Sequence, residues 1–271
     1  RIAALAPSWA PGRAHPIDFR YGRPSFDALP QRIWRRLVAR HLRAGSVAAL
    51  DYGEPAGWLP LREAIARHVA RTRAVVCRAE QVVVVHGSQQ GLQLLAQTLL
   101  DPGDRVVVEE PGYVGATFAF LGAGARVVPV PVDAAGLRLS ARDPRAAGAR
   151  LVHVTPSHQF PTGVTMPLER RRALLAWAER RRAWIVEDDY DSEFRFEASP
   201  LESLQGLDGG RRVIYLGTFS KVLFPALRIG YLILPPSLVP AVVAAKALAD
   251  TGGATLEQRV LATLLHDGLF D

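Results

Sequence analysis

Short apolar runs rich in Val, Ile and Leu alternate with amphipathic stretches over most of this chain. Such runs, bounded by Gly, Pro or Asp, are typical of buried strands, and apolar positions three and four apart indicate the helices between them. We predict seven strands, at residues 81–87, 105–111, 125–132, 151–157, 183–189, 213–221 and 228–235. The alternation predicts an α/β fold with a seven-stranded, mostly parallel sheet and helices on both faces.

The last two predicted strands are separated only by the segment VLFPAL, residues 222–227. A parallel pair needs a crossover of a dozen or more residues, so this pair is predicted to be antiparallel. Helices are predicted at residues 31–43, 61–73, 88–100, 113–124, 167–182, 240–250 and 256–270. Residues 1–45 are interpreted as an N-terminal arm with one helix, and residues 46–250 as the main domain.

Composition narrows the class of protein. With 271 residues, 49% of them apolar, the chain can bury a substantial core. The single cysteine, Cys77, excludes an intrachain disulfide and fits a reducing compartment. The sequence contains neither a signal-peptide pattern nor an apolar run approaching the roughly 20 residues that span a bilayer. We therefore expect a soluble, cytoplasmic protein without a membrane partner.

The net charge of +7 and the pI near 10.1 raise the possibility of nucleic-acid binding. However, the arginines are interspersed with acidic residues on helical patterns such as residues 168–182. This arrangement favours solvated helix faces over a surface that enters a groove of nucleic acid.

The use of lysine is informative. Of 33 Lys and Arg residues, only Lys221 and Lys246 are lysines. A lysine amine can lose its proton and attack a carbonyl group, whereas guanidinium stays charged. Lys246 lies in a helical pattern and is interpreted as a surface residue. Lys221 follows an apolar run and a small turn, which places it at the C-terminal end of a strand, where open α/β sheets bind their ligands.

Hydroxyl groups and an arginine surround Lys221. Thr218 and Ser220 precede it, and Arg228 follows where the chain enters its last apolar run. An amine among phosphate-binding groups suits a Schiff base to a phosphate-bearing aldehyde. This is the chemistry of pyridoxal phosphate.

Other predicted strands also end in residues with chemistry. Gly87 and Ser88 open a helix after the first strand, as an anion site or as an ordinary N-cap. Tyr113, after the second, either lies flat on an aromatic ring or packs in the core. In Glu187-Asp188-Asp189, a carboxylate can pair with a pyridinium nitrogen or bind Mg²⁺. The sequence has neither a nucleotide-binding GKS/T loop nor His/Cys ligand spacing, which disfavours the metal. Together, these strand ends match the phosphate, ring and aldehyde of one pyridoxal phosphate.

Several motifs resemble a known family. They are YGEPAGWLPLREAIA, GSQQGL, DPGDRVVVEEPGY, TPSHQFPTGVTMP, EDDYDSEFR and GTFSKVLFPALRIGYLILP. In order and spacing they are similar to the fold-type I aminotransferases, and more closely to the aminotransferase-like domain of MocR-type regulators of the GntR family. The resemblance runs from about Phe19 to the end of the chain. It implies a pyridoxal phosphate-dependent large domain, with residues 251–271 beginning a truncated C-terminal small domain.

The resemblance also implies roles for individual residues. Lys221 would form the internal aldimine, Asp188 would pair with the pyridine nitrogen, and Tyr190 would bind the ring hydroxyl. Tyr113 would stack on the ring. Five residues would hold the phosphate: Ser88, Gln89, Thr218, Ser220 and Arg228. Tyr52 matches a tyrosine that reaches the phosphate of the neighbouring subunit, which implies a homodimer.

Two departures from the enzymes bear on function. Phe160 stands where aminotransferases usually have an Asn that contacts the ring hydroxyl. The chain also stops before the small-domain arginine that binds a substrate carboxylate. The favoured hypothesis is the effector domain of a regulator, which senses a small amino compound. Its winged-helix DNA-binding domain would precede Arg1, outside this chain. An aminotransferase that moves amino groups between an amino acid and a 2-oxo acid is the alternative. A module that binds nucleic acid through its own arginines is the least favoured.

Overall fold

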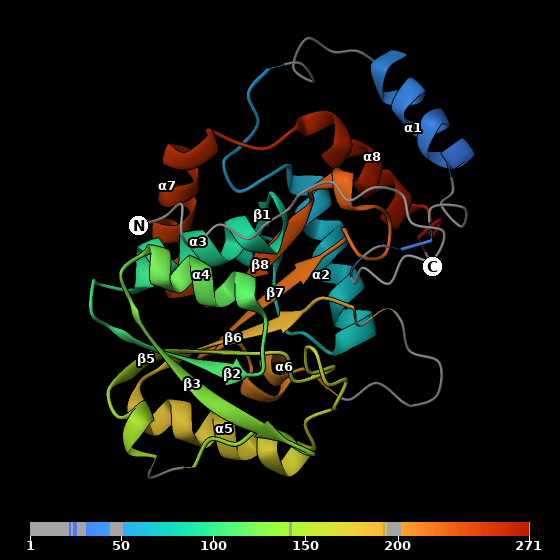
Figure 1. Cartoon of the computed structure of the whole chain (residues 1–271). Helices are drawn as coiled ribbons and strands as arrows, with labels where there is room; N and C mark the ends of the chain where they lie inside the picture. Colours follow the sequence, from blue (N-terminus) through green and yellow to red (C-terminus); the bar gives the residue numbers. More distant parts are fainter. Residues whose placement is uncertain are drawn as a thin grey trace, which may run out of the picture.

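The computed structural model describes residues 22, 24–25, 31–43, 51–140, 143–191, 193 and 202–270. Most of the predicted N-terminal arm, and part of the motif at residues 187–195, lie outside these described residues. The described chain forms one mixed sheet with helices packed on it (Figure 1). Its strands are β1 (Val82–Val85), β2 (Arg105–Glu110), β3 (Arg126–Asp133), β4 (Gly136–Leu137), β5 (Ala149–Val154), β6 (Trp184–Asp189), β7 (Val213–Thr218) and β8 (Gly230–Ile233).

The strand order confirms the predicted topology. The sheet runs β1-β8-β7-β6-β5-β2-β3-β4. Strands β3, β2, β5, β6 and β7 pair in parallel, whereas β8 pairs antiparallel with both β7 and β1. All seven predicted strands are present, with β8 as the predicted antiparallel strand. The eighth, β4, was not predicted, because it has only two residues and forms by pairing antiparallel with the end of β3.

Helices connect the strands and extend beyond them. They are α1 (Gln31–Arg43), α2 (Leu59–Arg73), α3 (Gly87–Leu99), α4 (Val114–Gly122), α5 (Leu168–Arg181), α6 (Leu204–Asp208), α7 (Val239–Asp250) and α8 (Thr255–His266). Short 3-10 turns lie at η4 (Ala79–Gln81), η5 (Pro144–Ala146), η6 (Pro225–Leu227) and η7 (Pro236–Leu238). Only α6 was not predicted. It begins at Ser203, whose side chain accepts a hydrogen bond from the Gly206 amide, and ends at Gly209 in the left-handed region.

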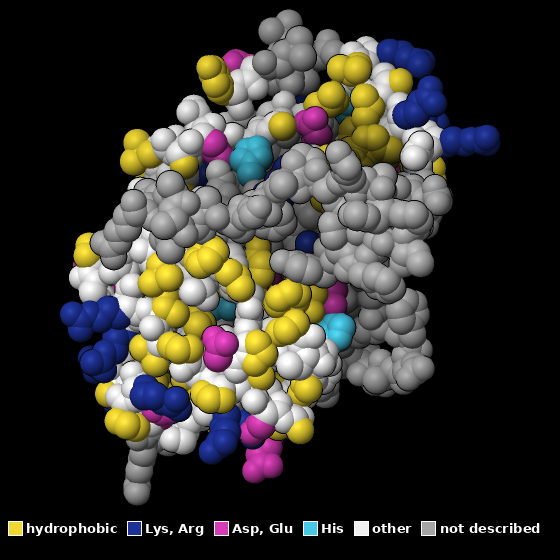
Figure 2. Space-filling model, in the orientation of Figure 1, with side chains coloured by type: hydrophobic (Ala, Val, Ile, Leu, Met, Phe, Trp, Pro, Cys, Tyr) yellow, Lys and Arg dark blue, Asp and Glu magenta, His cyan; other side chains and the backbone are white. Residues whose placement is uncertain are grey.

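Charged side chains of both signs are visible on one face of the described molecule. On the described part of the face shown in Figure 2, Lys and Arg side chains lie in separate groups, with Asp and Glu side chains near some of them. This view agrees with the prediction of solvated helix faces. None of the described helices has the length and apolar character needed to cross a membrane.

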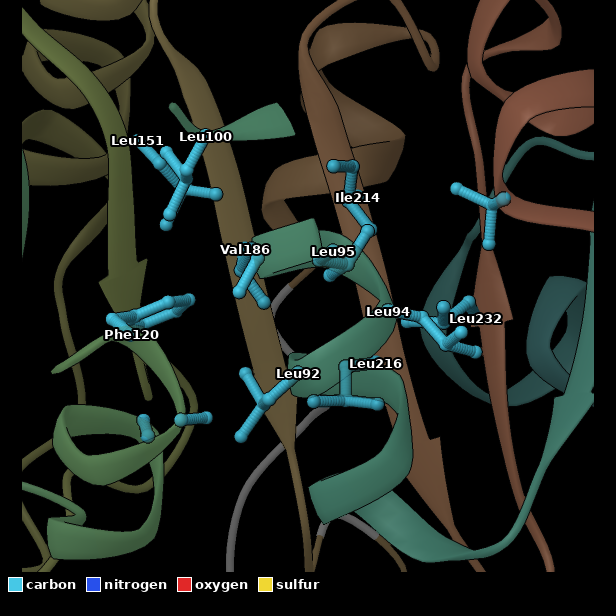
Figure 3. Packing of buried hydrophobic residues seen from close by; sticks show 14 of the residues in the cluster. Leu92, Leu94, Leu95, Leu100, Phe120, Leu151, Val186, Ile214, Leu216 and Leu232 are labelled. Carbon is cyan, nitrogen blue, oxygen red and sulfur yellow. The ribbon is translucent and has the colours of Figure 1, made fainter. Parts of the chain in front are cut away.

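The core consists of layers on both faces of the sheet. On β2, Val106 and Val108 pack into one apolar cluster with residues of α3, α4 and α7. Val107 points to the opposite face, into a cluster with α5 and α6. Figure 3 shows side chains of α3, among them Leu92 and Leu95, beside those of β6, β7 and β8. Each fully buried leucine contributes about 1.5–3 kcal/mol of transfer free energy, so this packing fixes α3 against the sheet.

A third apolar cluster joins helices α1 and α2 to helix α8. Residues of α1, α2 and α8 pack together against alternate positions of β1, β7 and β8, such as Val84, Tyr215 and Ile233. The predicted division into arm, large domain and small-domain start stays a prediction.

The parallel order reverses between β2 and β5, since the chain proceeds from β2 to β3 and then from β5 to β7. Ligands of open α/β sheets bind beside such a reversal, at the carboxyl ends of the strands.

Candidate functional site

The predicted site residues gather at one edge of the sheet. Strands β2, β5, β6 and β7 are parallel, and β1 runs in the same direction because β8 is antiparallel to both β1 and β7. Their carboxyl ends therefore meet. This edge carries Tyr113 after β2, Asp188 in β6 and Lys221 after β7. Arg228 lies at the same edge because β8 begins where its neighbours end.

Lys221 is half-buried at this edge. Its Nζ donates a hydrogen bond of 3.4 Å to the carbonyl of Gly22. Burial lowers the pKa of the amine, the carboxylate of Asp188 opposes that shift, and the guanidinium of Arg228 adds to it. The lowered pKa increases the fraction of neutral amine, which is the form that attacks a carbonyl group.

Asp188 is buried, and its two oxygens have different surroundings. Oδ2 lies 3.2 Å from Nε2 of His153 on the neighbouring strand β5. Oδ1 is buried and has no hydrogen-bond partner among the described residues. A buried carboxylate oxygen without a donor is costly, so it fits a ligand that brings an N–H group, as a protonated pyridine ring does.

The turn after β7 offers a second buried atom without a partner. The Thr218 hydroxyl donates to the carbonyl of Ile229 at 3.5 Å and accepts a hydrogen bond from the Ser220 amide at 3.2 Å. The Oγ of Ser220 is buried and unpartnered among the described residues. A hydroxyl in this position can donate to an oxygen of a bound phosphate.

The start of α3 lies against Arg228. Nη2 of Arg228 donates to the carbonyl of His86 at 3.0 Å. Gly87 adopts φ +72°, and a Cβ at this position would lie 2.8 Å from Nη2 of Arg228. Glycine is therefore required here both by the backbone conformation and by the close approach of the guanidinium. Ser88 and Gln89 follow in the first turn of α3, both half-buried, where amides favour an anion.

Aromatic rings form a continuous wall of the site. The hydroxyl of Tyr113 donates to Oε1 of Gln89 at 3.3 Å. The ring of Phe160 meets both Tyr113 and Tyr190 edge-to-face, with centroids 6.1 Å apart in each case. Burial raises the pKa of Tyr190, and the charges of Asp191 and Asp188 raise it further. Its hydroxyl therefore stays protonated and able to donate.

Phe160 has no donor or acceptor in its ring, and its neighbours are engaged elsewhere. Gln159 is buried, and its Nε2 donates to the carbonyls of Pro111 at 2.9 Å and Phe160 at 2.6 Å. Nδ1 of His158 pairs with Oδ2 of Asp191. The side chains of Gln159 and His158 are thus both engaged with protein groups.

The three consecutive acids of β6 differ in their partners. Glu187 accepts hydrogen bonds from the amides of Leu204 and Gln205, each at 2.9 Å. Asp189 pairs with Nε of Arg73 at 2.6 Å and accepts from the Tyr215 hydroxyl at 2.5 Å. Glu187 and Asp189 thus hold neighbouring segments, and Asp188 remains for the site. Among the described residues, no group of three or more His, Cys, Asp or Glu side chains is arranged to hold a metal ion.

Tyr52 is the predicted site residue that does not join the others. Its side chain is 86% exposed, and its amide donates to Oδ1 of Asp51 at 2.8 Å. The predicted role of Tyr52 in a neighbouring subunit stays a prediction.

The sequence analysis missed one residue of the site and misjudged the burial of a residue outside it. His153, which holds Asp188, was not singled out, although a histidine inside the apolar run LVHV is a signal that could have been used. Lys246 was interpreted as a surface residue, and this was wrong. It is 1% exposed and pairs with Asp250, because α7 turns this side of the helix toward the molecule.

The chain is similar to known proteins over nearly its whole length. The family model "Aminotransferase class I and II" matches residues 15–271. The chain is 44% identical over 256 residues to the probable rhizopine catabolism regulatory protein MocR of Rhizobium meliloti, covering 94% of this chain and 51% of that protein. It is 41% identical to the HTH-type transcriptional regulator TauR of Rhodobacter capsulatus, covering 93% of this chain and 52% of that protein. The chain thus spans about half the length of these curated relatives.

Among solved structures, the α-aminoadipate aminotransferase LysN of Thermus thermophilus, complexed with N-(5'-phosphopyridoxyl)-L-leucine, matches with a TM-score of 0.85. The two sequences are 36% identical, and the match covers 93% of this chain and 64% of that one. The predicted fold and the predicted cofactor, pyridoxal phosphate, are confirmed at the level of the family.

Proposed function

Because the chain belongs to the family of class I and II aminotransferases, we propose that it is the cofactor-binding, ligand-sensing part of a MocR-type transcriptional regulator. The observation that carries the proposal is the position of the Lys221 amine, whose pKa is influenced by Asp188 and Arg228 at the same sheet edge. Regulators such as MocR and TauR, at 44% and 41% identity, support a sensory rather than a metabolic role.

Pyridoxal phosphate supplies an aldehyde that condenses with amines and a ring that withdraws electrons from the attached carbon. In this proposal Lys221 binds it covalently through its neutral amine. Oδ1 of Asp188 would accept the ring N–H, and His153 would keep the carboxylate oriented. The Tyr190 hydroxyl would donate to the ring oxygen, and Tyr113 would cover one face of the ring.

The phosphate of the cofactor would be held by the residues around Arg228. Arg228 supplies charge and a forked donor, and the free hydroxyl of Ser220 supplies a further donor. The remaining three positions of this group, proposed from the family resemblance, are Ser88, Gln89 and Thr218.

The presence of Phe160 favours the role of a ligand sensor over that of an enzyme with rapid turnover. In this position an Asn would give the ring oxygen a second donor, whereas the Phe160 ring fills the space between Tyr113 and Tyr190. Tyr190 would then be the main donor to the ring oxygen. A site with fewer groups to stabilise charge on the ring is expected to bind an amino compound but to convert it slowly.

The wider architecture is part of the same proposal. The chain would form a homodimer in which Tyr52 reaches the phosphate site of the partner. Residues 251–271 would begin a small domain. DNA would be bound by a separate N-terminal domain, since the chain spans only about half of MocR and TauR. The regulator would act in the cytoplasm and respond to a small amino compound.

An aminotransferase is the second candidate, and the likeness to LysN at a TM-score of 0.85 favours it. It would use the same residues, with Lys221 moving a proton after it is released from the cofactor.

The visible absorbance of the protein with pyridoxal phosphate separates the two candidates. A panel of amino compounds and then a 2-oxo acid are added. In a sensor, the band shifts with one amino compound and stays shifted. In an aminotransferase, the band converts to that of the amine form of the cofactor, and the oxo acid restores the original band. This second result would overturn the sensory role.

Covalent attachment is tested in the same samples. Borohydride reduction followed by peptide mass spectrometry should place the pyridoxyl group on Lys221. The chain has only one other lysine, Lys246, so a label there would show that the wrong residue was chosen. The Lys221→Ala variant should fold normally and lose the covalent band. A reading frame without a DNA-binding domain upstream of Arg1 would argue against the regulator.

A further inference from the structure

Buried Lys246 and half-buried Asp250 form an ion pair on α7, outside the site described above. Nζ of Lys246 lies 2.7 Å from Oδ1 and 2.8 Å from Oδ2 of Asp250, one helical turn later. Lys246 is 1% exposed. The compact ammonium thus lies within hydrogen-bond distance of both carboxylate oxygens.

Asp250 connects this pair to the start of α3. Its Oδ2 accepts a hydrogen bond of 2.8 Å from Nε2 of Gln90 and lies 3.4 Å from Nε2 of His86. Its Oδ1 accepts the amide of Gly252 at 3.0 Å. One carboxylate thus holds the end of α7 and the first turn of α3 together.

Gln90 links Asp250 to the turn that Arg228 contacts. Oε1 of Gln90 accepts the amide of His86 at 2.7 Å, while the carbonyl of His86 accepts from Arg228 at 3.0 Å. The contacts therefore run without a break from Lys246 through Asp250, Gln90 and His86 to Arg228.

Packing alone does not fix the guanidinium of Arg228. The residue is exposed, and a cavity of about 200 Å³ lies beside it, lined among others by His86, Lys246, Gly253 and Gln258. Because there is room for other side-chain positions, the direction of Arg228 depends on the acceptor that His86 offers.

We propose that Lys246, Asp250 and Gln90 are positioning residues, which fix the His86 carbonyl and so direct Arg228 toward the cofactor phosphate. They do not touch the cofactor. This inference rests on the proposed role of Arg228 in phosphate binding, and it ties retention of the cofactor to α7.

The test compares pyridoxal phosphate with pyridoxal, which lacks the phosphate. Dissociation constants are measured for both by absorbance titration of the cofactor-free protein. In Gln90→Met, which leaves the Lys246–Asp250 pair in place, the constant for pyridoxal phosphate should rise about tenfold, the scale expected for a displaced hydrogen bond to a charged group. The constant for pyridoxal should stay within about twofold, because it does not use Arg228.

Asp250→Asn and Lys246→Arg should also raise the ratio of the two dissociation constants, that for pyridoxal phosphate divided by that for pyridoxal. Asp208→Asn is the matched control. Asp208 is a buried carboxylate, and it accepts the amides of Arg212 at 2.6 Å and Val213 at 3.1 Å, at the opposite end of β7 from Lys221. This variant should lose stability and keep both dissociation constants.

The outcomes distinguish the possible failures. An unchanged ratio in a folded Gln90→Met variant would overturn the inference, as would an equal loss of affinity for both compounds, which would indicate general damage. Wild-type protein whose affinity does not depend on the phosphate at all would overturn both this inference and the proposed role of Arg228.

Discussion

Lys221 illustrates how a site residue affects the stability of the cofactor-free protein. Burial lowers its pKa in the folded chain below the ordinary value of 10.5. Between the lowered pKa and 10.5 the unfolded chain binds more protons than the folded chain. The free energy of unfolding of the cofactor-free protein should therefore rise with pH in this range.

In Lys221→Met this contribution is absent, so the variant should be more stable than the wild type at neutral pH and should gain less stability as the pH rises. Urea unfolding of both proteins at several values from about pH 7 to about pH 10 measures the difference. Parallel stability profiles would contradict the expectation.

Asp188 and Asp189 are adjacent in sequence but should respond differently to the same substitution. Asp188→Asn removes the charge that would pair with a protonated ring nitrogen. Affinity for pyridoxal phosphate should then fall about ten- to a hundredfold, as for a lost charge-assisted hydrogen bond, while the fold is retained. Absorbance titration gives the affinity.

Asp189→Asn provides the comparison. This variant breaks a buried pair with Arg73 and should cost about 3–5 kcal/mol of stability, measured by urea unfolding. Its effect on cofactor affinity should be smaller than that of Asp188→Asn. The assignment of the ring partner would be wrong if the two variants bound the cofactor equally well.

At the residue scale, the sequence identified groups whose chemistry is unusual for their surroundings. Lys221 stood out because lysine is rare in this chain, and Asp188 because acids end a buried strand. His153 and the burial of Lys246 were missed for a physical reason. Both depend on which side of a strand or helix meets a neighbour distant in sequence, and spacing along one element does not carry that information.

Among the elements, the start of α3 offers a prediction with a close control. Gly87→Ala places a Cβ where φ is +72° and the guanidinium of Arg228 would lie 2.8 Å away. The left-handed conformation should cost about 1–2 kcal/mol, and displacement of Arg228 should lower affinity for pyridoxal phosphate about tenfold.

Gly148→Ala should lose only the stability that the left-handed conformation costs. Gly148 has φ +71° and open space where its Cβ would be. Urea unfolding should show similar losses of stability in the two variants, and absorbance titration should show weakened binding only in Gly87→Ala. Equal affinity in both would mean that the contact with Arg228 does not matter for the cofactor.

The elements themselves were largely predictable. Strand β1 is a continuous apolar run and β7 is nearly one, so both need little context. The short connection before β8 required an antiparallel neighbour. The two misses, β4 and α6, have two and five residues. Elements this short carry no periodic signal, and they form because a partner strand or a capping side chain is already in place.

The whole molecule is proposed to work as a dimer, and Tyr52 allows a test. Tyr52→Ala should weaken binding of pyridoxal phosphate about tenfold, and Lys221→Ala should abolish covalent binding. In a mixed dimer of the two variants, one site would have both its own Lys221 and an intact Tyr52 from the other chain. Mixing should therefore restore a tight covalent site, seen as recovered absorbance at low cofactor concentration.

No recovery after verified exchange of subunits would contradict the proposal that Tyr52 acts in the partner. The sequence pointed to this role through the family resemblance alone. An exposed tyrosine has no local pattern that distinguishes a partner's site from ordinary surface, so its function depends on an assembly that the chain by itself does not specify.

The antiparallel strand β8 also has a consequence for biosynthesis. Val82 of β1 lies opposite Ile233 of β8, and β8 is the only strand that β1 pairs with in the described sheet. On a ribosome that adds about 5–20 residues per second, β1 waits on the order of ten seconds for its partner. The turn after β1 and Arg228 meet only when β8 arrives. Loading of the cofactor should therefore be a late event, and nascent chains that end before β8 should not retain it.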